Sequence, residues 1–333
     1  MIFSFGRDNL ALTTFVPYDC KNKCPFCSSK ETYKTHRPST DNVKYQLKRV
    51  LTEFNYPIKD VVFTGGEPMA DVDGLKELID LVPSQYNIYI NTTFTNRNID
   101  EFVDLVNECP KIKGVNISRH SETYEQDCAL LCDIAIDDKI AMFQKPVRIN
   151  CVVKNQDVSK VIERWNGTGV HLYFRKDFNI EQDFTELHNP YDELTMKLIA
   201  YGFGFKAHTQ CNVCDTTIFE KNGQVVAYHK GQRNSSVQVG EYLEINDLII
   251  DQTGAFTFDW GKNDLRIISE LEQKHKTNKT SLQIAMEKLR NTFSIEPTYT
   301  VCHSHYSCGG YNRGCGGGYK GCGGGYKGCG GGC

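Results

Sequence analysis

Three cysteines near the N-terminus, Cys20, Cys24 and Cys27, have the type and spacing of metal ligands. They form a C-x3-C-x2-C run, and three thiolates held on one loop can bind three corners of a cubane iron–sulfur cluster. No fourth cysteine lies nearby in the sequence. One iron of such a cluster would remain open to a small molecule, so the spacing predicts a site that does chemistry rather than one that only stabilises the fold.

Two other uses of these cysteines have to be weighed. A structural zinc site usually takes four closed ligands, often supplied as closely spaced pairs. Here the triplet has no local partner, and His36 is the nearest further ligand. A disulfide is the second alternative, but an odd number of cysteines cannot pair among themselves. The triplet alone is therefore a moderate signal for an iron–sulfur site.

A second motif follows within residues 60–69. The run Val61–Thr64 is short and largely apolar, which indicates a buried strand, and Gly65, Gly66 and Glu67 come directly after it. Two glycines let the backbone approach a ligand closely. Glu67 would then lie at the carboxyl end of the strand, where ligands bind in parallel α/β folds. A plain strand-to-helix turn is the alternative, and the triplet upstream disfavours it.

Together, the cysteine triplet and the Gly-Gly-Glu-Pro strand end resemble the radical S-adenosylmethionine (SAM) superfamily. The resemblance implies a 4Fe–4S cluster on Cys20, Cys24 and Cys27, with SAM chelated to the free iron. It also implies reductive cleavage of SAM to a 5′-deoxyadenosyl radical, which takes a hydrogen atom from a substrate. An electron donor similar to flavodoxin or ferredoxin would supply the electron. The resemblance covers roughly residues 10–180, a typical domain length.

The same resemblance assigns further residues to SAM. Phe26 would pack near the adenine, and the Gly65–Glu67 segment would contact the methionine amino group. Three later strand ends, in 115–120, 147–153 and 172–175, match the family more weakly, and each could equally be an ordinary strand that ends in solvated polar groups. Their polar residues are the remaining candidates for SAM contacts: Ser118, Arg119, Asn150 and Arg175.

Strands and helices are predicted to alternate around these motifs. The apolar patterns indicate strands at 10–16, 61–64, 86–91, 115–120, 147–153 and 172–175, and helices at 42–54, 75–81, 100–107 and 158–165. Such alternation predicts parallel βαβ units. We therefore expect an α/β fold, a partial (β/α)6 TIM-like barrel, over residues 1–180.

Residues 181–300 predict a small α+β C-terminal extension that could cap the barrel mouth. A helix is expected at 190–200, followed by a hairpin around Asn222-Gly223, a second hairpin at 248–260, and helices at 265–275 and 281–293. Asn-Gly is a strong hairpin signal because both residues tolerate positive φ.

Cys211 and Cys214 form a C-x2-C pair at the start of this strand-rich region. Such a pair is compatible with half of an iron–sulfur site, half of a zinc site, a redox pair, or two reduced surface thiols. Metal binding is slightly favoured, because many members of the superfamily that the chain resembles carry auxiliary clusters after the barrel. A second iron–sulfur cluster or zinc is thus a candidate cofactor. The residues that could complete the site lie near the start of the tail: Cys302, His303, His305 and Cys308.

Residues 301–333 form a low-complexity tail of Cys, Gly and Tyr. Its cysteines at 308, 315, 322 and 329 have a period of seven, but glycine spacers leave no apolar seam for a coiled coil. The composition predicts disorder unless something binds the tail. The tail could deliver metal or clusters, could be a substrate carried in cis at high effective concentration, or could have no chemistry of its own.

Composition narrows the functional classes. A chain of 333 residues with 40% hydrophobic content can bury a large core, and its net charge of −3 argues against nucleic acid as a partner. No apolar run reaches the roughly 18 residues of a membrane-spanning helix, and the N-terminus is too short and polar for a signal peptide. Cysteines without a signal suggest metal binding or catalysis in a reducing compartment, so we expect a cytoplasmic protein without a membrane partner.

The sequence therefore predicts a radical SAM enzyme that acts on a peptide or protein side chain, with its own tail as one candidate substrate. A small-molecule cyclase or isomerase similar to the molybdenum-cofactor enzyme is the alternative within the same chemistry. A non-catalytic iron–sulfur scaffold or metallochaperone is the alternative from another class, and it would have no need for Gly-Gly-Glu at a strand end. No general base is identified from the sequence.

Overall fold

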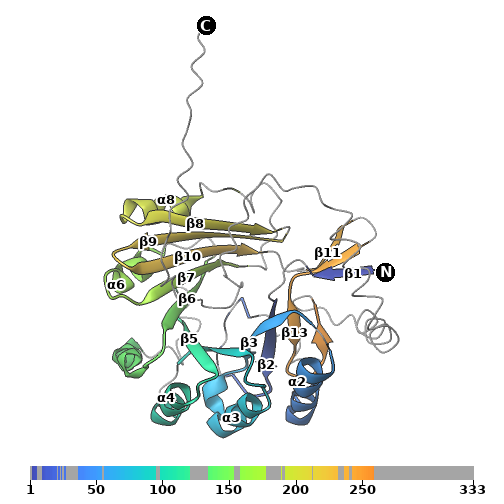
Figure 1. Cartoon of the computed structure of the whole chain (residues 1–333). Coiled ribbons are helices and arrows are strands. Elements are labelled where there is room, and N and C mark those ends of the chain that lie inside the picture. The colour runs from blue at the N-terminus through green and yellow to red at the C-terminus, as the bar shows by residue number, and fades with distance from the viewer. Residues whose placement is uncertain are drawn as a thin grey trace, which may run out of the picture.

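In the computed structural model, the described strands form one large curved sheet with helices along its outer side, and a second, small sheet (Figure 1). It describes residues 2–5, 10–20, 22, 24, 26–27, 37–54, 56–94, 98–120, 134–153, 158–177, 189, 192–211, 213–231, 236–239 and 242–258. The tail at 301–333 and the helices expected at 265–275 and 281–293 lie outside these residues.

Six neighbouring parallel strands form the centre of the sheet. They follow one another in chain order and in spatial order. These strands are β2 (Leu10–Val16), β3 (Ile58–Gly65), β4 (Asn87–Thr92), β5 (Ile112–Ser118), β6 (Val147–Val153) and β7 (His171–Lys176). Parallel neighbours need crossover connections, which the helices supply. The predicted α/β partial barrel is thereby confirmed.

Helices cover the outer face of these strands. In the first of them, Ser39 caps the N-terminus through its hydroxyl, and Val43, Leu47, Val50 and Leu51 form the buried stripe, the spacing of an amphipathic helix. The helices are α2 (Thr40–Glu53), α3 (Val72–Asp80), α4 (Ile99–Glu108), α6 (Ser159–Trp165) and α8 (Glu193–Ala200), with short 3-10 helices η1 (Pro68–Ala70) and η2 (Ile134–Met142).

The chain beyond residue 200 adds strands to both margins of the six. An antiparallel meander of β8 (Gly204–Cys211), β9 (Cys214–Lys221) and β10 (Gln224–Gly231) joins one margin, because β10 runs parallel to β7. At the other margin, β13 (Leu248–Ile250) runs parallel to β2 and pairs with β14 (Phe256–Thr257). The result is an unclosed sheet of eleven described strands.

A second, small sheet lies beside β2 and β13 in Figure 1. It has the order β1-β12-β11 and consists of β1 (Ile2–Phe5), β11 (Ser236–Val239) and β12 (Tyr242–Ile245). β1 and β12 are parallel, so a segment near the start of the chain is paired with one near residue 242.

The two faces of the large sheet differ in chemistry. Residues such as Ile90, Ile117 and Ile149 belong to the apolar core beneath the helices. Their neighbours along each strand point to the opposite, inner face, which carries polar groups such as Asn116 and Arg148. An inner face of this kind is built to surround a polar ligand rather than to pack a second apolar layer.

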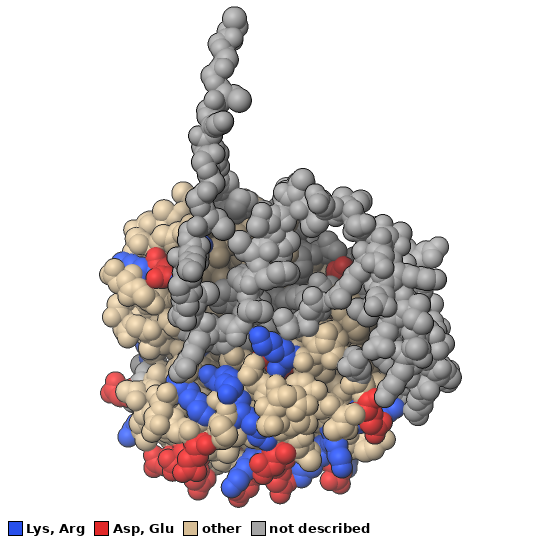
Figure 2. Space-filling model, viewed as in Figure 1, with Lys and Arg blue, Asp and Glu red and all other residues tan. Residues whose placement is uncertain are grey.

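The outer surface shows no dominant charge. On the face drawn in Figure 2, Lys and Arg side chains alternate with Asp and Glu along the side where α2, α3 and α4 lie, in keeping with the net charge of −3. Among the described helices, none has the length and apolar character required to span a bilayer.

Candidate functional site

The loop after β2 carries the cysteine triplet, and the structure brings its members together. Cys20, Cys24 and Cys27 are reduced and half-buried. The backbone N–H of Cys27 donates to the carbonyl of Cys24 at 3.2 Å, so these two cysteines share one turn. Cys20 lies within electrostatic range of Cys24, Cys27 and Glu67. The thiols therefore gather beside the carboxyl end of β3.

Burial and a nearby carboxylate both act on the first cysteine of this loop. Burial raises the pKa of the Cys20 thiol to about 12, and the charge of Glu67 acts in the same direction. At neutral pH this group is therefore a neutral thiol in the metal-free protein, and a coordinating metal would deprotonate it. Across the described part of the chain, no three His, Cys, Asp or Glu side chains converge on one ion. A cubane cluster binds each thiolate to a different iron, so it does not require such convergence.

Asn22, between the first two cysteines, supports a group bound inside the loop. Its side-chain Oδ1 and Nδ2 are both buried, and neither has a hydrogen-bond partner among the described residues. Buried amides in folded proteins are nearly always hydrogen-bonded. The cysteine loop therefore fits a polar cofactor. Sequence reasoning missed Asn22, and the only available signal was its position inside the triplet.

Phe26 docks the cysteine loop onto the end of β5. Its ring meets that of His120 edge to face, with centroids 4.6 Å apart. His120 is buried, and its Nδ1 accepts a hydrogen bond from the N–H of Val152 at 3.2 Å. Burial lowers the pKa of His120 to about 3, with a further contribution from Arg119, so the ring is neutral. The aromatic position expected near the adenine thus lies over the strands on which SAM contacts are expected.

Glu67 is held from two sides at the end of β3. Its Oε1 accepts from the N–H of Met69 at 3.0 Å and from the Thr92 hydroxyl at 2.5 Å. Its Oε2 accepts from the N–H and the hydroxyl of Thr93, at 2.8 and 2.5 Å. The side chain is 4% exposed. Its carboxylate is therefore engaged within the protein, where it ties the turn after β3 to the end of β4.

The two glycines before Glu67 bring the backbone against its neighbours. Gly65 has φ of +98°, and a Cβ at this position would lie 2.8 Å from the Cα of Phe15 on β2. Only glycine satisfies both conditions. Gly66 is buried beside it. The predicted close approach of the backbone is thus present, and its first partner is the neighbouring strand.

Three of the weaker predictions, Ser118, Arg119 and Asn150, meet where β5 ends beside the middle of β6. The Arg119 guanidinium is buried, and its Nη1 donates to the carbonyls of Thr93 and Ser118 at 2.7 and 2.8 Å. The N–H of Arg119 donates to the carbonyl of Asn150 at 2.9 Å. Arg119 therefore joins the ends of β4 and β5 to the middle of β6. Arg175 lies apart from this group, on β7 in register with His229 of β10.

Arg148, on the inner face of β6, is a residue that sequence reasoning missed. It is 8% exposed. Its Nε donates to Oδ1 of Asn150 at 3.1 Å, and its guanidinium lies 4.2 Å from the ring centroid of Tyr173. No described carboxylate forms an ion pair with it. A buried cation without a counter-charge is costly, so this position fits an anionic ligand. The signal in the sequence was its alternation with Ile149 and Cys151, which face the core.

The C-x2-C pair lies at the end of the β8–β9 hairpin. Cys211 and Cys214 are register partners, and Cys214 takes part in a disulfide. The side chain of Cys211 and residues 302–308, including His303 and His305, fall outside the described residues. Whether the pair holds a metal remains a prediction from its sequence.

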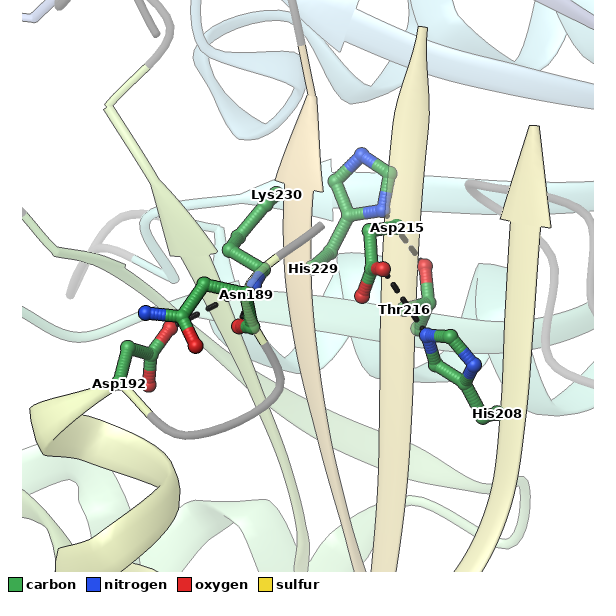
Figure 3. A network of polar contacts seen from close by, with 7 residues as sticks. All are labelled: Asn189, Asp192, His208, Asp215, Thr216, His229 and Lys230. Atoms are coloured by element: carbon green, nitrogen blue, oxygen red, sulfur yellow. Dashed lines mark hydrogen bonds and ion pairs between the residues drawn. The ribbon is translucent and has the colours of Figure 1, made fainter. Parts of the chain in front are cut away.

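Figure 3 shows polar contacts of side chains on β8, β9 and β10. His208 Nε2 lies 2.9 Å from Asp215 Oδ2, and Thr216 Oγ1 lies 2.8 Å from His229 Nδ1. The Lys230 ammonium donates to the carbonyl of Asn189 at 2.5 Å and lies 3.6 Å from Asp192. His229 faces the inner side of the sheet, whereas its neighbour Lys230 faces the other side.

Comparison with known proteins identifies a family model and solved structures to which this chain is similar. Residues 15–136 match the radical SAM superfamily. The structure is similar to that of Streptococcus suis SuiB bound to S-adenosylmethionine, at 18% identity and a TM-score of 0.44, over 60% of this chain and 47% of SuiB. It is also similar to native anSMEcpe with bound AdoMet and Cp18Cys peptide, at 15% identity and a TM-score of 0.47, over 75% and 73% of the two chains. The chain thus spans less than half of SuiB. No curated protein matches the sequence.

Proposed function

The segment 15–136 belongs to the radical SAM superfamily, and we propose that this chain is an enzyme that uses a 4Fe–4S cluster and SAM to abstract hydrogen from a substrate. When bound, the cluster supplies the electron that cleaves SAM, and SAM supplies the 5′-deoxyadenosyl radical. The observation that carries the proposal is the gathering of three reduced cysteines beside Glu67, after the carboxyl ends of β2 and β3.

Each part of the cysteine loop has a separate task in this proposal. Cys20, Cys24 and Cys27 hold three irons, and the amide of Asn22 supplies the polar contact that its burial calls for. The contact between Phe26 and His120 keeps the loop closed over β5 and excludes water from the reacting atoms.

Glu67 acts on SAM through the backbone rather than through its own carboxylate. That carboxylate is saturated by Met69, Thr92 and Thr93. By fixing the turn it presents the backbone of Gly65 and Gly66 to the methionine amino group. In this proposal Glu67 is a positioning residue.

Arg148 receives the carboxylate of SAM. It lies on β6, whose Asn150 is in register with Ser118 of β5, and both of these residues are candidates for SAM contacts. Pairing with a carboxylate would offset the desolvation of the buried guanidinium. The ring of Tyr173, 4.2 Å from this group, keeps the guanidinium in position.

The substrate is a peptide or protein side chain, and the tail of the same chain is the first candidate. What supports it is the repeated Gly-Gly-Gly-Tyr-Lys-Gly-Cys unit, which presents tyrosine and cysteine at regular intervals, together with the high effective concentration of a tethered substrate. A flavodoxin- or ferredoxin-like protein is the proposed electron donor, and the reducing cytoplasm is the proposed compartment.

The test of the cofactor assignment is formation of 5′-deoxyadenosine by the full chain. The protein is reconstituted anaerobically with iron and sulfide and then given dithionite and SAM. Cys24→Ala should abolish the product because one corner of the cluster loses its ligand. Cys109→Ala, at another free and half-buried cysteine, should leave it intact. Equal product from wild type and Cys24→Ala would rule out the assignment.

The tail is tested separately by mass spectrometry of the intact chain. After incubation with dithionite and SAM, the wild type should show a mass change that maps to residues 308–333, whereas Cys24→Ala should show none. If 5′-deoxyadenosine forms but the tail keeps its mass, the tail is not the substrate, and the radical chemistry acts on another molecule.

A further inference from the structure

Asn22 lies between the first two cysteines of the loop and contacts the first of them through its backbone. Burial raises the pKa of the Cys20 thiol, and the N–H of Asn22, which donates a hydrogen bond to the sulfur, acts in the opposite direction. Cys24 follows two residues later and shares a turn with Cys27. Asn22 is therefore anchored to one proposed ligand of the cluster and lies two residues before the next.

The side chain of Asn22 differs from that of a structural asparagine. Its Oδ1 and Nδ2 are both buried, and neither has a hydrogen-bond partner among the described residues. Asn107 on α4 shows the usual case, because its Nδ2 donates to the carbonyl of Met142 at 3.0 Å and its Oδ1 accepts from the N–H of Gln144 at 2.9 Å. A buried amide without such contacts is costly to the folded chain.

Sulfur is the acceptor that the cysteine loop can offer to this amide. The sulfur of a neutral thiol accepts hydrogen bonds only weakly. A thiolate or sulfide bound to iron carries negative charge, and hydrogen bonds to charged acceptors are about twice as strong as those between neutral groups. The N–H groups of the Asn22 side chain therefore gain a strong acceptor when a cluster is bound.

We propose that the Asn22 amide donates a hydrogen bond to a sulfur of the 4Fe–4S cluster and thereby raises the reduction potential of that cluster. This inference rests on the proposed function, from which the cluster comes. Reduction transfers one electron from the donor protein and makes or breaks no bond, so it adds one negative charge. An N–H directed at sulfur stabilises the more negative state, and such hydrogen bonds are among the factors that set cluster potentials. Asn22 thus makes electron delivery more favourable.

The first experiment compares the reduction potentials of wild type and Asn22→Leu. Leucine has the branched shape of asparagine but no polar atom. The full chain is reconstituted anaerobically with iron and sulfide and titrated without SAM, and the reduced cluster is followed by EPR through the signal that Cys24→Ala lacks. At the wild-type midpoint, the ratio of reduced to oxidised cluster in Asn22→Leu should fall about tenfold, the equivalent of about 59 mV for one electron.

The control is Asn107→Leu, which removes a partnered amide on α4 and should titrate as wild type does. Equal midpoint potentials in wild type and Asn22→Leu would overturn the proposal.

A second experiment uses the metal-free, reduced chain, in which the amide lacks its proposed partner. Replacing an unpaired polar group by an apolar group of the same shape is nearly neutral or stabilising. Asn22→Leu should therefore not lower the free energy of unfolding, whereas Asn107→Leu should lower it, because two hydrogen bonds are lost. If both variants lose the same stability, the Asn22 amide has its partner within the protein, and the proposal fails.

A third experiment needs no variant, so it decides the matter even where Asn22→Leu does not retain iron. Wild type is labelled with 15N in its asparagine side chains. Pulsed EPR of the reduced cluster should then show hyperfine coupling to a 15N nucleus that the unlabelled chain lacks. A reduced cluster without this coupling would contradict the hydrogen bond.

Failure of this proposal is distinguishable from failure of the radical SAM assignment. If wild type acquires no cluster that depends on Cys24, the proposed function fails, and the role of Asn22 fails with it. If such a cluster forms but its potential does not respond to Asn22→Leu, only the role of Asn22 is refuted. None of these readouts requires cleavage of SAM.

Discussion

Replacement of Glu67 by glutamine tests whether the carboxylate holds the turn after β3. Oε1 accepts from the N–H of Met69, and Oε2 accepts from the N–H of Thr93. An amide keeps one oxygen and exchanges the other for an NH2 group, which cannot accept. The hydroxyls of Thr92 and Thr93 can rotate to accept from this group, but a backbone N–H cannot. Whichever way the amide is turned, one backbone donor, the buried N–H of Met69 or the half-buried N–H of Thr93, faces another donor.

The size of the loss follows from these contacts. A hydrogen bond to a charged group contributes about 1.5–3 kcal/mol, and a buried donor without an acceptor costs about 1–3 kcal/mol. With some relaxation of the turn, we expect Glu67→Gln to lower the free energy of unfolding by about 2–4 kcal/mol. Denaturant unfolding of the reduced full chain, followed by far-UV circular dichroism, measures the loss.

The control is Glu53→Gln at the end of α2. Glu53 is exposed and pairs with Arg49 at 3.4 Å, and exposed pairs of this spacing contribute about 0.3–0.5 kcal/mol. If Glu67→Gln changes the free energy of unfolding no more than this control does, then the carboxylate does not stabilise the turn after β3, and its role as a positioning residue is refuted.

Three other substitutions test separate features. Gly65→Ala should lower the free energy of unfolding by about 3 kcal/mol or more, because strain at positive φ adds to a clash with Phe15. Gly169→Ala is the control, since this glycine has φ of +78° but open space around it, and its loss should be smaller. Equal losses of the two variants in denaturant unfolding would contradict the clash. Arg148→Met should weaken SAM binding at least about 30-fold in anaerobic calorimetry, and an unchanged affinity would count against the carboxylate contact. Burial lowers the pKa of His120 from 6.5 to about 3, so between these pH values the unfolded chain binds a proton that the folded chain does not. The free energy of unfolding should therefore fall as pH decreases from 6.5 toward 3, by up to about 1.4 kcal/mol per pH unit. The His120→Gln variant should show a shallower dependence of stability on pH, and an equal dependence would exclude the ring as its source.

The central strands could be predicted because burial on the helical face leaves a local apolar signal. The strands expected at 10–16 and 147–153 have the observed bounds of β2 and β6. β3 begins at Ile58, before the expected start at 61. The first residues of β3 include Asp60, which faces inward and accepts a hydrogen bond from the side-chain amide of Asn87 at 2.9 Å. A prediction that relies on consecutive apolar residues leaves out an inward-facing polar residue at the strand end. The predicted strand is therefore shorter than the observed one.

The pairing of distant strands could not be predicted from the sequence. β10 pairs with β7, and β13 pairs with β2. Long-range pairing depends on which sheet margin is open after the centre has formed, and no local pattern reports it. The same holds for the small sheet of β1, β11 and β12, whose strands have only four residues each.

The residues of the candidate site also differ in how far they could be predicted from the sequence. The cysteine triplet and Glu67 could be found because residue type and spacing suffice to suggest their chemistry. Arg148 resembles an ordinary strand residue in the sequence. Its significance comes from the inner face on which it lies and from the ring of Tyr173 on the neighbouring strand. These are properties of neighbouring strands and of packing, so they become visible only in three dimensions.

The pairing of β13 with β2 also sets the order of events during biosynthesis. Leu248–Ile250 align with Leu12–Thr14, so the strand that precedes the cysteines gains its second neighbour only after translation has passed residue 250. At about 5–20 residues per second, the ribosome reaches that point well after the cysteines have emerged. Iron delivered to the nascent polypeptide would meet thiols on a strand with one open margin. Maturation of the holoprotein should therefore follow synthesis of the segment that forms β13.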